Sequence, residues 1–338
     1  MQNDIILLGH GSGGKLSHQL LDELIIPILS QVAQSEQNDA AVLEGIKGDR
    51  IAFTTDSYVV DPIVFAGGNI GDLAINGTVN DLAMSGARPL ALSVGLILEE
   101  GLKLDELREI LLAMKAAADK AGVRIVTGDT KVVPRGKGDK IFINTSGIGV
   151  FDHELRPAGN AARPGDKVLI NGSIGDHGMA VLASREGLEL QTGIETDSAP
   201  LNAMVAKLLA EHGAAIHVLR DPTRGGVATT LKEIALQSGV DICLAEEDLP
   251  VSDSVAGACA ILGLDPLFVA NEGKLLAIVA ANVAEEALAT MRACEFGEQA
   301  TIIGEVTDVS AGRVMMRTAI GGLRAIEMLA GEQLPRIC

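Results

Sequence analysis

The sequence predicts a protein of the α/β or α+β class with two domains. Apolar runs of strand length alternate with longer stretches of helical periodicity, as in proteins that pack helices against sheets. The length of 338 residues suits two domains. Pro and Gly become dense in RPAGNAARPGDK, residues 156–167, and we place the domain boundary there.

In the first half, an apolar run at 5–8 is expected to be a strand that leads into the loop GHGSGGK. A helix is expected over 16–29, followed by a polar loop over 30–49. Strands are expected at 50–55, 90–98, 123–127 and 141–150, with helices over 71–86 and 104–121. We assign residues 1–45 to a glycine-rich N-terminal segment and 46–155 to the first domain.

In the second half, the strand KVLING opens a domain assigned to residues 156–330. Further strands are expected at IHVLR, LFVA and TIIGEV. Helices are expected near 179–186, 200–212 and 283–293, and after Arg224-Gly225-Gly226. Residues 331–338 are expected to form a flexible tail, which could reach roughly 26 Å if extended.

Composition limits the possible functions. The chain is 47% hydrophobic with no Trp, so its core should be aliphatic. A formal net charge of -18 argues against a nucleic-acid or anionic-membrane surface, although Mg²⁺ and backbone N–H groups could still neutralise a bound nucleotide. The start MQNDIILLGH is not a signal-peptide pattern, and no apolar stretch is long enough to span a bilayer, so we expect a cytoplasmic protein.

The loop at residues 9–15 is similar to a phosphate-binding loop. It fits G-x-x-x-x-G-K, but the next residue is Leu16, which has no hydroxyl to ligate Mg²⁺. We therefore reject a standard P-loop and expect a flexible glycine loop that folds over phosphates. An ordinary strand-to-helix turn explains the segment equally well. The residues expected to contact phosphate are Gly11, Gly13, Gly14 and Lys15.

Acidic residues recur where the apolar strands are expected to end. Ligands of α/β proteins gather at the carboxyl ends of strands, and carboxylates there suit Mg²⁺. For any single Asp a helix cap or turn is the commoner explanation, so the prediction depends on the recurrence. The candidates are Asp56, Asp129, Asp221 and Glu272, with Asp81 and Asp39 as additions.

Basic and glycine-rich segments accompany these acids. Lys131 follows Asp129 in GDTK and could stabilise a phosphoryl-transfer transition state, or it is an ordinary surface lysine. Arg224-Gly225-Gly226 could bring a guanidinium and backbone N–H groups to a phosphate, or form a simple helix N-terminus. We expect His177, in IGDHG, to be a structural hydrogen-bonding residue rather than a catalyst.

The cysteines lie at positions 243, 259, 294 and 338 without a CxxC pair, so neither a zinc site nor a disulfide framework is predicted. The first three have apolar neighbours typical of small buried side chains. Cys338 is the last residue, which excludes a prenylation box and suits a mobile thiol that carries a group between active sites. An accidental terminal cysteine is the other explanation. The terminal carboxylate would raise its pKa and Arg336 would lower it, so the net direction stays open.

The chain resembles the HypE hydrogenase maturation factors of the PurM-like, or aminoimidazole ribonucleotide synthetase-like, ATP-binding superfamily. The resemblance covers essentially the whole chain, and the PRIC end separates it from thiamine-monophosphate kinase and selenophosphate synthetase. The segments that carry it, in order, are GHGSGGK, TTDSYVVDP, GGNIGDLAINGTVNDLAMSGARP, VTGDTKVVPRG, IGDHG, LRDPTRGG, FVANEGK and PRIC.

The resemblance implies a two-domain PurM-like fold whose amino-terminal sheet pairs with a second copy in a homodimer. It implies ATP and Mg²⁺ between the domains, and a partner, HypF, that supplies a carbamoyl group from carbamoyl phosphate. The S-carboxamide on Cys338 would be dehydrated to an S-cyanocysteine. The cyano group would then pass to iron on a HypC–HypD complex, for [NiFe]-hydrogenase.

The same resemblance implies which residues form the site. It also implies a tail that swings inward for dehydration and outward for loading and delivery. Cys338 would be the carrier, Glu272 the base, and Lys131 would stabilise negative charge. ATP would contact Gly11, Gly13, Gly14, Lys15, Asp129, Thr130, Arg224, Gly225 and Gly226. Mg²⁺ would contact Asp56, Asp81 and Asp221, with Asp39 and Asp129 as weaker candidates. Two alternatives remain: another PurM-like ATP-using kinase or synthetase with Cys338 incidental, or a non-catalytic nucleotide-sensing scaffold.

Overall fold

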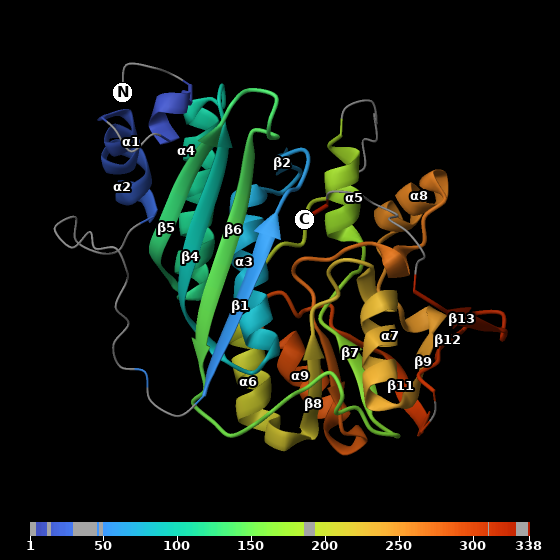
Figure 1. Ribbon diagram of the computed structural model, residues 1–338. Helices are drawn as coiled ribbons and strands as arrows, with labels where there is room; N and C mark the ends of the chain where they lie inside the picture. The colour runs from blue at the N-terminus through green and yellow to red at the C-terminus, as the bar shows by residue number, and fades with distance from the viewer. Residues whose placement is uncertain are drawn as a thin grey trace.

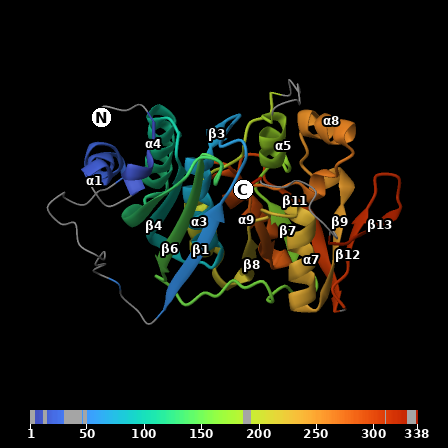
Figure 2. The same ribbon diagram turned by 45° about the horizontal axis from the view of Figure 1, so that its top comes forward.

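The computed structural model describes residues 5–11, 15–29, 46, 50–185, 193–309, 311–328 and 337–338. Two separate sheets, each packed against helices, lie beside one another, and the C-terminus lies between the two halves of the molecule (Figures 1 and 2). The two-domain fold predicted from the sequence is confirmed. No helix among the described residues is long and apolar enough to cross a membrane.

The first sheet has four strands in the order β1-β6-β4-β5. Its strands are β1 (Ile51–Tyr58), β4 (Arg88–Glu99), β5 (Arg124–Val133) and β6 (Ile141–Val150), and a small ribbon pairs β2 (Val64–Phe65) with β3 (Gly68–Asn69). Neighbours are antiparallel except β4 and β5, which are parallel and joined by α4 (Leu104–Ala121). Among the described helices, α3 (Ile70–Met84) and α4 lie behind the sheet in Figure 1, and none lies in front of β1, β6 and β4.

Helix α3 is positioned by its first turn and by its glycines. Asn69 and Asp72 form a capping box, in which Asn69 accepts from the Gly71 N–H at 2.8 Å and Asp72 accepts from the Asn69 N–H at 2.7 Å. A Cβ at Gly77 would lie 2.2 Å from the Tyr58 hydroxyl, so only glycine lets α3 approach β1 this closely. The helix is therefore pressed against the inner face of β1.

The second sheet has seven strands in the order β13-β12-β9-β11-β7-β10-β8. Only the β12–β9 pair is parallel, and such a mostly antiparallel sheet beside helices is an α+β arrangement. The strands are β7 (Lys167–Ile170), β8 (Ile216–Arg220), β9 (Val240–Ala245), β10 (Leu276–Val279), β11 (Thr301–Val309), β12 (Val314–Arg317) and β13 (Leu323–Ile326). The helices are α5 (Asp176–Ala183), α6 (Asn202–His212), α7 (Gly226–Ser238), α8 (Asp253–Leu262) and α9 (Ala284–Arg292).

The core is aliphatic, as composition predicts, and Tyr58 is its largest fully buried side chain. Separate apolar clusters lie between the first sheet and its helices and on the two faces of the second sheet. Residues 15–29 are helical as expected, as α1 (Lys15–Leu20), a π-helical turn (Leu21–Ile25) and α2 (Ile26–Leu29).

Two expected strands are wrong. In the run at 5–8, only an isolated bridge from Ile5 to Lys103 forms, and a 3₁₀ turn, Leu8–Gly11, follows. LFVA contains a 3₁₀ turn, Pro266–Phe268, because Asp265 caps it and Pro266 occupies its first position. The strands β9, β10, β12 and β13 and the helix α8 were not predicted.

Candidate active site

A small cavity at the junction of the two domains gathers most of the predicted reactive residues. Its volume is about 200 Å³, and a neighbouring cavity of about 510 Å³ shares several of its walls. The smaller cavity is lined by Thr55, Asp56, Gly77, Asp81, Asp221, Thr223, Arg224, Glu272 and Cys338. Four separately predicted acids, one arginine and the terminal cysteine therefore meet at one place.

The acids reach this place from different elements. Asp56 lies inside β1 and alternation turns it to the inner face, whereas Asp221 directly follows β8. Asp81 lies in the last turn of α3 and accepts a hydrogen bond from the Thr54 hydroxyl at 2.8 Å. The expectation that these acids end strands is therefore confirmed for Asp221 only. Asp129 lies inside β5, as Asp56 does inside β1, and Glu272 follows a 3₁₀ turn instead of a strand.

The carboxyl groups of this cavity crowd one another. Burial, and then the charge of Asp81, raises the pKa of Asp221 to about 7. Burial also raises the pKa of Asp81, and Asp56 adds to the increase. Asp81 stands at the carboxyl end of a helix, where a negative charge is further disfavoured. The arrangement favours a cation among these carboxylates.

The donor set suits Mg²⁺, which takes one or two carboxylates and completes its coordination with water and phosphate oxygens. Within the described part of the chain, no group of three or more His, Cys, Asp or Glu side chains already has metal-holding geometry. Asp56, Asp81 and Asp221 are thus suited to a magnesium ion that shares its coordination with a phosphate rather than to a closed protein cage. Asp39 lies outside the described residues.

Glu272 is held by its backbone and unpartnered at one side-chain oxygen. Its N–H donates to Asp197 Oδ1 at 3.0 Å, and its carbonyl accepts from Asn80 Nδ2 at 3.2 Å. Its Oε1 is buried and has no hydrogen-bond partner among the described residues. Burial, and then the charge of Asp197, raises the pKa of Glu272 well above its usual range. Once ionised, a carboxylate with a raised pKa is a strong proton acceptor, and this one lines the small cavity.

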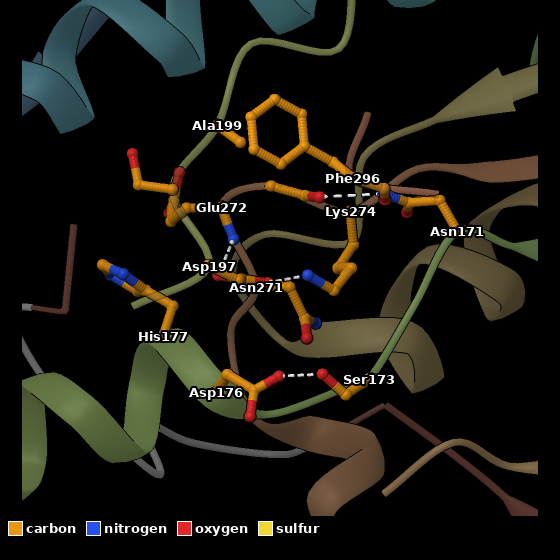
Figure 3. Close-up of polar contacts among 12 residues, drawn as sticks. Asn171, Ser173, Asp176, His177, Asp197, Ala199, Asn271, Glu272, Lys274 and Phe296 are labelled. Carbon is orange, nitrogen blue, oxygen red and sulfur yellow. Dashed lines mark hydrogen bonds and ion pairs between the residues drawn. The ribbon is translucent and has the colours of Figure 1, made fainter. Parts of the chain in front are cut away.

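Asp197 and Lys274 are residues that the sequence interpretation missed as parts of the site. Figure 3 shows Asp197 between the Glu272 backbone and the Lys274 ammonium, with which it forms a buried ion pair at 3.1 Å. Lys274 belongs to the NEGK block, which was the one available signal, whereas no motif surrounds Asp197. Their pairing fixes the backbone that carries Glu272.

Cys338 is docked inward. The Ile337 side chain is buried in the core cluster of the first domain, and Cys338 packs against the same cluster. The Ile337 carbonyl lies 2.9 Å from His177 Nε2, and the Cys338 carbonyl accepts from the Val59 N–H at 3.3 Å. Burial, followed by the charge of Glu272, raises the pKa of the Cys338 thiol to about 12, and Arg224 opposes this only in part. The docked sulfur is therefore protonated.

The free energy of docking residues 337 and 338 is a small difference between two opposing contributions. Burying an isoleucine side chain contributes ~1.5–3 kcal/mol, while ordering each residue costs roughly 1–2 kcal/mol of backbone entropy. Since Ile337 and Cys338 are both ordered, the net gain is small. Residues 331–336, which include Arg336, lie outside the described residues.

Arg224-Gly225-Gly226 forms the entry to α7. Arg224 Nη2 lies 4.0 Å from Asp56 Oδ1, and Gly225 and Gly226 have positive φ of 77° and 64°. A Cβ on Gly226 would lie 2.4 Å from the Leu267 carbonyl, so close packing against Leu267 requires glycine at this position. The Gly226 N–H already donates to the Thr223 carbonyl at 2.9 Å, so it is not free for a phosphate.

Lys131 does not reach this cavity within one chain. Asp129 pairs with Gly95, Gly95 pairs with Asn144, and Asn144 pairs with Ser57. Asp129 therefore lies on the same outer face as Ser57, opposite to Asp56. Lys131 lies on the same outer face and pairs with Asp129 at 2.6 Å. Strand β5 is three strand spacings from β1, roughly 14 Å. Lys131 and Glu272 therefore belong to separate sites of one chain.

A third cavity, of about 300 Å³, lies at the β5 edge. Its walls include Asp129, Thr130 and Lys131 together with His10, which brings the start of the glycine-rich segment to this edge. Gly11 ends the 3₁₀ turn and Lys15 begins α1, whereas Gly13 and Gly14 lie outside the described residues. Of the residues predicted to bind ATP, Asp129 and Thr130 thus line this cavity, whereas Arg224 lines the cavity at the domain junction.

The two-domain fold and the carboxylate cavity at its junction define an AIR synthase related protein. The model of the AIR synthase related N-terminal domain matches residues 37–151, and that of the C-terminal domain matches residues 163–317. A thiamine-monophosphate kinase structure from Stenotrophomonas maltophilia has a TM-score of 0.63 at 20% identity, which shows the shared fold alone.

Proteins that match nearly the whole length of this chain identify a narrower family within that class. The carbamoyl dehydratase HypE of Cupriavidus necator is 50% identical over 98% of this chain and 94% of its own length. The Escherichia coli protein of the same name is 44% identical over 98% and 99%. A crystal structure of HypE in complex with ATP has a TM-score of 0.93 at 52% identity, covering 98% of this chain and 99% of the other. The chain belongs to the HypE family, as the sequence segments predicted.

Proposed function

We propose that this chain is an ATP-dependent carbamoyl dehydratase that converts an S-carboxamide on Cys338 to an S-cyanocysteine. The observation that carries the proposal is the placement of Cys338 in one cavity with Glu272, Arg224 and three aspartates. Relatives named carbamoyl dehydratase HypE, and a HypE solved with ATP, support the same reaction and the same nucleotide.

The reaction balances as a dehydration driven by phosphoryl transfer. The carboxamide oxygen attacks the γ-phosphorus of ATP, and ADP leaves. The carbon–oxygen bond then breaks with phosphate as the leaving group, and the carbon–nitrogen triple bond forms as two N–H protons are lost, one of which ends on phosphate. Glu272 is our candidate for the first proton because its Oε1 is buried, unpartnered within the described part of the chain, and high in pKa.

The other groups would bind and orient the reactants. Asp56, Asp81 and Asp221 would hold Mg²⁺, which supplies charge neutralisation at the phosphates. Arg224, which lines the same cavity, would contact phosphate. The high pKa of the docked thiol explains why the carbamoyl group would be loaded with the tail outward, where the sulfur ionises normally.

A homodimer would complete the site. The outer face of the first sheet exposes Ile51, Phe53 and Ile97 at 58%, 68% and 43%. Pairing this face with a second copy would cover them and place Lys131 near the partner's cavity instead of its own. Gly11, Gly13, Gly14, Lys15, Asp129 and Thr130 would also contact the nucleotide.

We also propose the partners that this chemistry needs. A HypE–HypF complex has been solved whose HypE-like chain has a TM-score of 0.80 at 48% identity, covering 92% of this chain and 99% of the other. HypF would deliver the carbamoyl group, and a HypC–HypD complex would accept the cyano group for the iron of [NiFe]-hydrogenase.

An intact-mass experiment tests the reaction. The protein is incubated with HypF, carbamoyl phosphate and MgATP, and a carbamoyl adduct that loses the mass of one water is expected. The Cys338→Ser variant should take up no stable adduct, while the matched control Cys243→Ser should behave like the parent. An adduct that persists with ATP would contradict the dehydratase. ATP turnover onto a small acceptor that continues in Cys338→Ser would instead support a kinase.

A further inference from the structure

His177 contacts the tail at the main-chain carbonyl of Ile337. It lies in the first turn of α5, is fully buried, and places Nε2 2.9 Å from the Ile337 carbonyl oxygen. Its other ring nitrogen, Nδ1, lies 2.8 Å from the Thr196 hydroxyl. Both ring nitrogens are thus engaged, one by the tail and one by the body of the protein.

The partners determine which nitrogen carries the proton. A carbonyl oxygen only accepts, so Nε2 must be the N–H that donates to Ile337. In the neutral ring Nδ1 then accepts from the Thr196 hydroxyl, whose oxygen also accepts the Ser198 N–H at 3.2 Å. Burial lowers the pKa of His177, which keeps the ring neutral. In the docked state the donor is therefore Nε2–H.

The ring is also held in place without the tail. The edge of Phe65 packs at 5.5 Å and 87° to the imidazole, and the Thr196 N–H donates to the Ala66 carbonyl at 2.9 Å. The residue after Thr196 is Asp197, which holds the Glu272 N–H. The two adjacent residues Thr196 and Asp197 therefore orient both His177, which binds the tail, and the backbone of Glu272.

We infer that His177 is a positioning residue whose Nε2–H donates to the Ile337 carbonyl and thereby places Cys338 beside Glu272. Recognition of a peptide carbonyl fixes the path of the chain, while the buried Ile337 side chain fixes its depth. When the tail leaves, the N–H loses this acceptor, so departure costs the free energy of this hydrogen bond. His177 is not in contact with the carboxylate cavity and takes no part in proton transfer.

A matched pair of variants tests the assignment. His177→Gln keeps an N–H donor at the place of Nε2, whereas His177→Asn keeps one only at the place of Nδ1, within reach of Thr196 but not of Ile337. The alkylation rate of Cys338 by iodoacetamide is read from the mass of the chain-terminal peptide. Because the docked thiol is half-buried and protonated, alkylation reports mainly the undocked fraction.

The rate should rise about tenfold in His177→Asn and stay within about twofold of the parent in His177→Gln. Alkylation of the half-buried Cys294 in the same samples should not change. Equal rates for the two variants, no rise in His177→Asn, or a parallel rise at Cys294 would each overturn the assignment. The measurement needs neither ATP nor a carbamoyl group, so its result stands apart from the proposed reaction.

Discussion

Asp221 and Asp129 are both acids of a candidate nucleotide site, yet their surroundings differ. Asp221 lines the inner cavity, where burial and Asp81 raise its pKa to about 7. Asp129 lies on the outer face, where a hydrogen bond from Lys131 lowers its pKa. The inner cavity gathers negative charge that its own cations do not balance, whereas the outer acid already has a partner. A bound cation thus has more to contribute inside than outside.

The largest expected effect follows from removing the inner base. Glu272→Gln keeps the shape of the side chain but cannot accept a proton, so ATP-dependent dehydration should fall by at least about 100-fold. The carbamoyl adduct on Cys338 should then accumulate in the intact-mass spectrum. Glu305→Gln, which removes an exposed ion pair with Lys167 at 2.6 Å, is the control and should react normally. Normal dehydration by Glu272→Gln would exclude it as the base.

The next effect concerns the outer face and the second copy. Lys131→Ala should lower dehydration by about 10–100-fold if its charge acts on phosphate. Mixing Lys131→Ala with Cys338→Ala chains should restore about a quarter of the activity, since half the dimers are mixed and each has one complete site. Inactive mixed dimers would show that Lys131 does not act across the interface. Cross-linking should confirm that the mixed dimers form.

The smallest effect compares the two acids through stability. The folded pKa of Asp221 lies above its usual 3.8, so its stabilisation is full below about pH 4 and is lost as pH rises through 7. In Asp221→Asn the free energy of unfolding should therefore fall less between these two pH values, by about 1–3 kcal/mol. Asp129→Asn should change stability by no more than about 0.5 kcal/mol, because exposed ion pairs are screened. Similar pH profiles for both variants would remove the distinction between the two environments.

Much of the fold could be predicted because local signals agree with the final packing. Helix α4 and strands β6 and β8 begin and end where periodicity placed them. Strand β10 was missed because LAIV is buried on both sides and has no alternation to identify it. LFVA failed for the opposite reason, since its apolar residues are buried beside a turn that Asp265 and Pro266 dictate.

The sequence could predict which residues form the candidate site, but not how they are arranged in space. Motifs identified Asp56, Asp81, Asp221, Glu272 and Cys338, which the fold brings together. The separation of Lys131 from them depends on sheet register and strand order, which no local motif carries. The contacts of Asp197 with Glu272 and of His177 with Ile337 could not be predicted either, because the partners are remote in sequence.

Asn80, on α3, binds both halves of the molecule together. Its Nδ2 donates to the Ala199 carbonyl at 3.0 Å and to the Glu272 carbonyl at 3.2 Å, while its Oδ1 accepts from the Leu201 N–H at 2.8 Å. A chimera that joins the first domain of one relative to the second domain of another must therefore match α3 to the incoming residues 199–201. Exchange of either side alone would leave buried amide groups without partners and shift Glu272, although the reacting residues themselves were all retained.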